Sequence, residues 1–172
     1  ALTRPKKQLT MVTKSNAQRH GMVLWDEIFE NLKHDYPGIT IDRMLVDAIT
    51  TRMVLQPQSL DTIVATNLHA DILSDLAAAL SGSLGIGPTA NINPERTFPS
   101  MFEPIHGSAF DLVGKDLANP LGAFWSCVMM LEHLQEKKGA SLLMSAIEEV
   151  CQEGRHLPID LGGNSCTDDV TT

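Results

Sequence analysis

The first 80 residues alternate short apolar stretches with stretches of helical periodicity, and this alternation constrains the fold more than any other feature. Residues 8–13 (QLTMVT) and 62–66 (TIVAT) have the β-branched, apolar character of strands. Between them, apolar side chains recur at helical spacing from Met22 to Leu32. The order strand, helix, strand, helix is typical of an α/β domain with a largely parallel sheet. We expect strands at 8–13, 39–46 and 62–66, and helices from a cap at Ser15 or Asn16 to about residue 35, at 47–55 and at about 71–80.

A glycine-rich stretch, SGSLGIGP at residues 81–88, interrupts this rhythm and predicts a boundary between domains. Within it, Gly85, Gly87 and Ala90 fit the dinucleotide-binding pattern G-x-G-x-x-A, which needs a strand before it and a helix after it. Here a helix precedes the pattern and a proline-containing loop follows, so we reject the match. Beyond it we expect a strand at 101–105, a nearly all-round apolar helix at about 121–135 that is buried on every side, and an amphipathic helix at 140–152.

Composition excludes several classes of protein. Thirteen Lys and Arg against 21 Asp and Glu give a net charge of −8, and without a basic run this argues against a nucleic-acid partner. The longest apolar run, at about 121–131, is too short to cross a bilayer, and the polar start does not resemble a signal peptide. We therefore expect no membrane association and a cytoplasmic location. Cys127, Cys151 and Cys166 are odd in number and widely spaced, which favours reduced thiols over disulfides.

Two aspartates one helical turn apart, Asp71 and Asp75, follow the strand at 62–66. Like charges at this spacing repel by a few tenths of a kcal/mol, so the pair costs stability unless a cation lies between them. One interpretation takes Asp71 as a first-turn residue favoured by the helix dipole and Asp75 as a solvated charge. The other takes both carboxylates as oxygen ligands of a hard divalent cation such as Mg²⁺ or Mn²⁺.

Several motifs in sequence order resemble the β-decarboxylating dehydrogenase family of isopropylmalate, isocitrate, tartrate and D-malate dehydrogenases. They are VTKSNAQ, VDAITTRMV, NLHADILSDL, GSLGIGPTANINPERTFPSMFEPIHGSAFD and ANP. The tartrate and D-malate branch is the most similar. The resemblance implies an α/β, isopropylmalate/isocitrate dehydrogenase-like two-domain fold, present here only as its C-terminal half. Residues 1–81 would be part of the dimerisation and metal-binding domain, and 82–172 the C-terminal part of the cofactor-binding domain.

The resemblance also implies a metal site shared between two subunits of a homodimer. Asp71 and Asp75 match the family's G-D-I-L-S-D aspartates, which bind Mg²⁺ or Mn²⁺, and Asp47 matches a third carboxylate that comes from the partner subunit. Lys14 matches the family lysine that takes the proton from the substrate hydroxyl in the partner's active site, although a lone lysine after a strand is more often a solvated charge. Asn16 matches an asparagine placed near the nicotinamide.

The segment EPIHGSAFD at residues 103–111 matches the family's adenine-binding loop. Without the resemblance, His106 would more often be a structural histidine. Asp111 resembles the carboxylate that accepts the ribose hydroxyls of NAD and would repel the 2′-phosphate of NADP. NAD is therefore the expected cofactor. The cofactor-binding residues implied are Asn16, Glu103, His106, Gly107, Ser108, Ala109, Asp111 and Asn119, of which Asn119 would read the adenine.

Three positions depart from the family pattern. Ala70 stands where the family has glycine and His69 where it has an aromatic residue, so His69 could approach the metal. Phe110 replaces a common proline, which implies a less rigid cofactor loop. The expected function is NAD-dependent oxidation, with or without β-decarboxylation, of a 2-hydroxy dicarboxylic acid such as tartrate or D-malate, assisted by Mn²⁺ or Mg²⁺. The alternative is a noncatalytic fragment or pseudoenzyme that acts as a binding or assembly module.

Overall fold

The computed structural model describes all residues from Ala1 to Thr172 and divides them into two compact units, Ala1–Ala77 and Ala78–Thr172. The division lies just before the glycine-rich stretch that predicted a boundary. The elements confirm the α/β class, and each unit is described by itself below.

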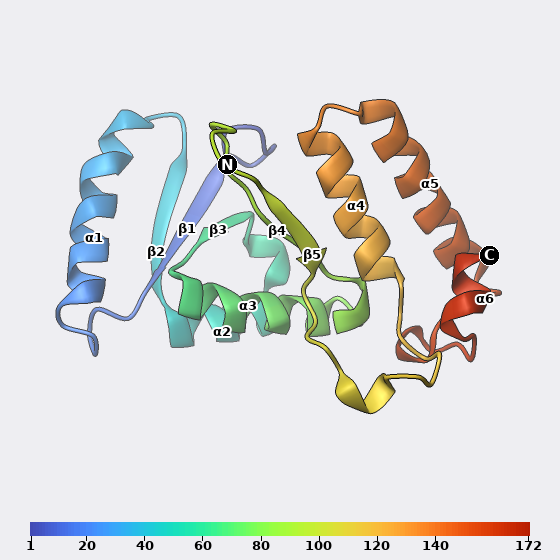
Figure 1. The fold of residues 1–172 in the computed structure, drawn as a ribbon. Coiled ribbons are helices and arrows are strands. Elements are labelled where there is room, and N and C mark those ends of the chain that lie inside the picture. The colour runs from blue at the N-terminus through green and yellow to red at the C-terminus, as the bar shows by residue number, and fades with distance from the viewer. The chain divides into compact units, whose positions relative to one another are not determined.

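The first unit contains a three-stranded parallel sheet in the order β2-β1-β3. Helices follow each strand, as the alternating sequence pattern predicts. Figure 1 shows α1 lying alongside the β1 and β2 ribbons. The elements are β1 (Gln8–Thr13), α1 (Gly21–Leu32), β2 (Thr40–Leu45), α2 (Val46–Leu55), β3 (Thr62–Val64) and α3 (Asn67–Leu80), the last of which continues past this unit.

The core of this unit lies between the central strand β1 and helices α2 and α3. Val12, Ile49, Met53 and Leu73 form its buried cluster, and Val12 and Ile49 are completely inaccessible to solvent. Burying each such side chain stabilises the fold by about 1.5–3 kcal/mol. This cluster fixes the end of β1 relative to the start of α2.

In this unit, two helices begin several residues away from where the sequence predicts. Helix α1 starts at Gly21 rather than after Ser15 or Asn16, because a turn in which Lys14 O accepts the Ala17 and Gln18 N–H groups intervenes. Helix α3 starts at Asn67. Asp71 therefore lies beyond the first turn, and the interpretation that the helix dipole favours it there is wrong.

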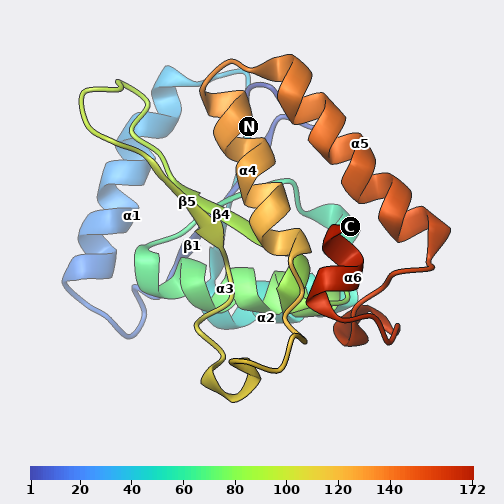
Figure 2. The ribbon, with the colours of Figure 1, turned by 45° about the vertical axis from the view of Figure 1, so that its right-hand side comes forward.

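The second unit combines an antiparallel pair of strands with three helices. Helices α4 and α5 lie side by side (Figure 2), and Val170 of α6 belongs to the same buried cluster as residues of both helices. Strand β4 escapes the sequence analysis because it begins at Pro88, a residue that strands tolerate only at their start or edge. A helix precedes Gly85 and this strand follows it, which confirms that no strand-turn-helix nucleotide motif is present there. The elements are β4 (Pro88–Asn91), β5 (Met101–Pro104), α4 (Leu121–His133), α5 (Lys137–Glu153) and α6 (Thr167–Thr171).

Helix α4 is buried on one side only. Its residues Leu121 and Val128 pack with Ala140, Ile147 and Val170 in the core of the unit. Cys127 and Met130 on α4 are nevertheless exposed, so the expectation of burial on every side is wrong for this chain. An apolar composition indicates what a helix can bury, but only neighbouring elements decide what is covered. No helix here is both long enough and apolar enough to cross a membrane.

Candidate active site

Lys14 and Asp47 meet at the carboxyl edge of the parallel sheet. Strands β1 and β2 end in register, with Thr13 opposite Leu45, so the residues that follow the two strands are neighbours. Lys14 comes directly after β1, and Asp47 lies in the first turn of α2. The Lys14 Nζ donates a hydrogen bond to Asp47 Oδ1 and forms an ion pair with it. Ligands of open parallel sheets bind at this edge, so the pair lies where a site is expected.

Asp47 is held in its ionised form by its surroundings. The hydrogen bond from Lys14 is the main cause that lowers the pKa of Asp47 below 3.8, and a backbone hydrogen bond adds to it. The Asp47 side chain is 64% exposed and that of Lys14 27% exposed, so both remain accessible to a ligand. The Asp47 carbonyl also accepts the Thr50 hydroxyl at 2.7 Å, which ties the residue to its helix.

Asp71 and Asp75 are exposed on α3, and their carboxylates accept no hydrogen bond and form no ion pair. They lie one turn apart on the same face. His69 is only 5% exposed, and its Nδ1 lies 3.4 Å from the Thr66 hydroxyl. Two residues along a helix correspond to more than half a turn, so His69 does not share the face of Asp71.

The donor set suits a hard divalent cation in part. Carboxylate oxygens are the ligands that Mg²⁺ and Mn²⁺ prefer, and Asp71 and Asp75 offer two unpaired carboxylates. Within one chain, however, no three His, Cys, Asp or Glu side chains come together in a way that could hold a metal ion. A complete set of ligands would thus need a group from outside this chain.

The second unit contains a cavity of about 990 Å³ that is open to solvent. Its walls include the loop from His106 to Ala109, together with Asn119, Gly85 and Asp160. The loop turns sharply at Ala109, whose φ of +43° places an L-residue in the left-handed region. The cavity thus gathers five of the eight residues that the sequence analysis assigned to a cofactor: His106, Gly107, Ser108, Ala109 and Asn119.

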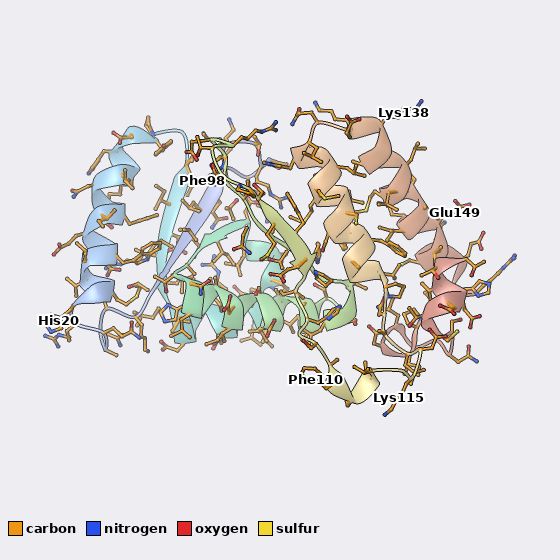
Figure 3. All side chains as sticks on the ribbon, viewed as in Figure 1. His20, Phe98, Phe110, Lys115, Lys138 and Glu149 are labelled. Carbon is orange, nitrogen blue, oxygen red and sulfur yellow. The ribbon has the colours of Figure 1, made fainter.

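The other three assigned residues lie elsewhere. Glu103 is exposed on β5, and Asp111 is exposed in the short 3₁₀ turn that follows Ala109; neither lines the cavity. Asn16 belongs to the first unit, where it borders a separate hollow. Phe110 is 85% exposed and projects from the loop in Figure 3, so its side chain is not packed in the core of the unit.

A hydrogen-bonded group that the sequence analysis missed lines one wall of the cavity. Asn119 Nδ2 donates to Asp160 Oδ2 at 2.9 Å, and the Ser83 hydroxyl donates to the same oxygen. The Gly85 N–H donates to Ser83 Oγ at 2.8 Å. Asp160 follows Asn119 by 41 residues and carries no motif of its own, so only the fold could reveal the contact.

Comparison with known proteins identifies the family. The Isocitrate/isopropylmalate dehydrogenase family matches residues 1–172, which is the whole chain. The chain belongs to this family. It is 66% identical over 171 residues to a "Probable tartrate dehydrogenase/decarboxylase" of Agrobacterium vitis, covering 99% of this chain and 48% of the relative. It is 46% identical over 175 residues to the "D-malate dehydrogenase [decarboxylating]" of Escherichia coli, with 99% and 48% covered.

Solved structures of the family confirm the fold. The crystal structure of isocitrate dehydrogenase from Methylococcus capsulatus superposes with a TM-score of 0.90 at 41% identity, covering 95% of this chain and 48% of that one. A β-decarboxylating dehydrogenase from Thermococcus kodakarensis gives a TM-score of 0.76 at 35% identity, covering 94% and 46%. The chain thus spans about half the length of the relatives it matches, as the sequence motifs predicted.

Proposed function

We propose that this chain forms the C-terminal half of the active site of an NAD-dependent dehydrogenase that acts on tartrate, D-malate or a similar 2-hydroxy dicarboxylic acid, with or without loss of the β-carboxylate. The observation that carries the proposal is the pairing of Lys14 with Asp47 at the carboxyl edge of a parallel sheet. The names of the tartrate and D-malate relatives support the substrate class.

Lys14 and Asp47 have distinct roles in this proposal. Lys14 Nζ, in its neutral amine form, accepts the proton of the substrate hydroxyl, directly or through a water molecule. Asp47 holds Nζ at the sheet edge and leaves it accessible. Both residues act in the active site of the opposite subunit of a homodimer, which accounts for a carboxylate pair on α3 without a third ligand in the same chain.

The acidic residues would hold the metal ion. Asp71 and Asp75 of one subunit would bind Mn²⁺ or Mg²⁺ together with Asp47 of the partner subunit. When bound, such an ion supplies a Lewis acid that offsets negative charge on the oxygen atoms of the substrate. The unpaired, exposed state of Asp71 and Asp75 supports this assignment, because no competing cation of the protein occupies them.

The cavity of the second unit would hold the adenosine end of NAD. His106, Gly107, Ser108 and Ala109 form its loop, and Asn119 offers a side-chain amide to the adenine. Asp111, just outside the cavity, would face the ribose and disfavour NADP. Glu103 and Asn16 are the remaining residues that we assign to the cofactor, and Asn16 would lie near the nicotinamide. The cytoplasmic location stays a prediction from the sequence.

A direct assay tests the proposed function. The complete gene product that contains these 172 residues is incubated with NAD, Mn²⁺ and, in turn, tartrate, D-malate and isopropylmalate, and NADH formation is followed. We expect turnover with tartrate or D-malate that a chelator abolishes and added Mn²⁺ restores. A product that turns over none of these acids contradicts the proposal.

The intact mass of the natural protein distinguishes the proposed enzyme from the alternative function. A catalytically silent product of 18.8 kDa would favour the noncatalytic binding or assembly module. The proposed dehydrogenase should have roughly twice that mass, in keeping with a two-domain protein.

A further inference from the structure

We propose that Asp160 is a positioning residue that locks the side-chain amide of Asn119 in one orientation, and that this lock makes the cavity select adenine over a 6-oxopurine such as hypoxanthine. The inference rests on the proposed function only in placing the purine end of a nucleotide in this cavity. Both residues line the cavity, and none of the sequence motifs described above includes Asp160.

The orientation of the Asn119 amide follows from its two partners. Nδ2 donates to Asp160 Oδ2 at 2.9 Å, and Oδ1 accepts the backbone N–H of Leu121 at 2.9 Å. The Leu121 N–H is at the start of α4 and can only donate, and a carboxylate can only accept. Rotating the amide by half a turn would place two donors face to face at Leu121 and two acceptors face to face at Asp160.

Asp160 is itself held by a hydrogen bond from Ser83. The Ser83 hydroxyl donates to Asp160 Oδ2, and Ser83, only 7% exposed, accepts the Gly85 N–H at 2.8 Å. A Cβ atom on Gly85 would lie 2.9 Å from Asn119 Nδ2 and would contact Asp160 Oδ2. Glycine at this position therefore lets the backbone approach the Asn119–Asp160 pair closely.

The locked amide leaves one donor and one acceptor free. A side-chain amide has two N–H donors and an oxygen with two lone pairs, and the contacts above use one of each. Because the amide cannot turn, the free N–H of Nδ2 and the free lone pair of Oδ1 keep their positions relative to a bound ligand. Adenine, which offers its N6 amino donor beside a ring-nitrogen acceptor, can satisfy both groups.

Hypoxanthine cannot satisfy both groups without turning the amide. It carries a carbonyl acceptor where adenine has the amino donor, so the order of donor and acceptor is reversed on its pairing edge. If the amide keeps its orientation, binding hypoxanthine leaves at least one hydrogen bond unmade. If the amide turns, its groups no longer match those of Asp160 and Leu121. Sites built to hydrogen-bond one partner reject an analogue that leaves a polar group unpaired.

Calorimetric binding of ADP and IDP to the complete gene product tests the lock without any turnover. We expect the unmodified protein to bind ADP at least about tenfold more tightly than IDP. Asp160→Asn can donate to a rotated Asn119, so it should lower the ADP-to-IDP preference by at least about fivefold, mainly by weakening ADP. The matched control is Asp168→Asn, which removes the same charge from an exposed residue outside the cavity and should keep the preference.

The ratio of the two affinities separates positioning from a general structural role. A structural role, or a lost charge acting on the diphosphate, changes the affinities for ADP and IDP by the same factor and would overturn the proposal. Equal binding of ADP and IDP by the unmodified protein would also overturn it, and that measurement needs no variant to fold. Failure to bind either nucleotide would instead refute the proposed cofactor cavity, and with it this inference.

Discussion

The two units of this chain present their candidate functional groups in opposite ways. In the first unit, Lys14, Asp47, Asp71 and Asp75 are charged side chains on an open surface at or near the edge of a parallel sheet. In the second unit, mostly small and neutral residues surround a cavity, and the charged Asp160 bonds to its neighbours in the wall. The first unit presents charged, reactive side chains, and the second presents a cavity whose shape can select a ligand.

This difference indicates which tasks each unit can perform alone. All residues that line the cavity belong to Ala78–Thr172, so the second unit alone can form it. The carboxylates of the first unit do not form a set of three, so a metal and a substrate need further groups. Variants should therefore separate chemistry from nucleotide binding, and the four predictions below test that separation.

The largest effect is expected from Lys14→Met in the complete gene product. It removes the proposed proton acceptor, so kcat should fall by about 10²–10⁴-fold, while the affinity for ADP stays unchanged. Steady-state kinetics with D-malate or tartrate and nucleotide titration measure the two quantities. Lys33→Met, which removes a lysine paired with Glu30 outside the site, serves as the control. A rise in KM with unchanged kcat would recast Lys14 as a binding residue.

A matched pair of core substitutions tests whether the units are independent. Ile49→Ala and Ile147→Ala each remove part of a buried side chain from one core, at a cost of about 2–5 kcal/mol in the free energy of unfolding. Hydrogen exchange followed by mass spectrometry should show faster exchange in the altered unit only. Only Ile147→Ala should weaken ADP binding. Equal losses of protection in both units would show that they unfold together.

The double variant Asp111→Lys with Leu112→Tyr tests the proposal that Asp111, an exposed residue outside the cavity, selects NAD over NADP. If the Asp111 carboxylate repels a 2′-phosphate as proposed, the double variant should shift the kcat/KM preference toward NADP by at least about tenfold, or 1.4 kcal/mol. The measurement compares both cofactors at fixed ionic strength, because Asp111 is exposed and salt screens its charge. Asp168→Lys controls for charge alone. If the unmodified protein already used NADP as well as NAD, the assignment of Asp111 would be wrong.

The smallest effect concerns the pKa of Asp47, and NMR titration of its carboxyl group can follow it. Lys14→Met removes the main cause that lowers this pKa, so the pKa should rise part of the way toward 3.8, while the backbone hydrogen bond keeps lowering it. A lowered folded-state pKa adds stability above 3.8 that is lost as the pH falls through the folded value. That acid-side loss should shrink in the variant. An unchanged pKa would show that the ion pair does not persist in solution.

Local sequence patterns predicted the elements that periodicity alone defines. Strand β1, helix α2 and helix α5 were expected close to where they occur, because their apolar spacing reflects which face is buried. The start of α1 was missed because Ser15 and Asn16 are good capping residues in a segment that forms a turn instead. Strand β4 was missed because proline and glycine dominate its flanks.

The candidate site likewise contains residues that local motifs predicted and residues that they missed. Motif similarity gave Lys14, Asp47 and the loop from His106 to Ala109, and the structure adds that Lys14 bonds to Asp47 and that the loop lines a cavity. Asp160 and Ser83 had no local signal, because their importance comes from contacts with residues far away in sequence. Long-range contacts of this kind depend on the tertiary fold and not on spacing.

The shared register of β1 and β2 has a consequence for how this chain tolerates insertions and deletions. Lys14 and Asp47 meet because each lies a fixed number of residues beyond a strand end, with Thr13 opposite Leu45. The connection through α1 can lengthen at little entropic cost, since doubling a loop adds only about 0.6 kcal/mol. Deleting a single residue inside β1 or β2 would instead turn every following side chain of that strand to the other face. Length variation among natural homologues should therefore collect in the connection and avoid the strands.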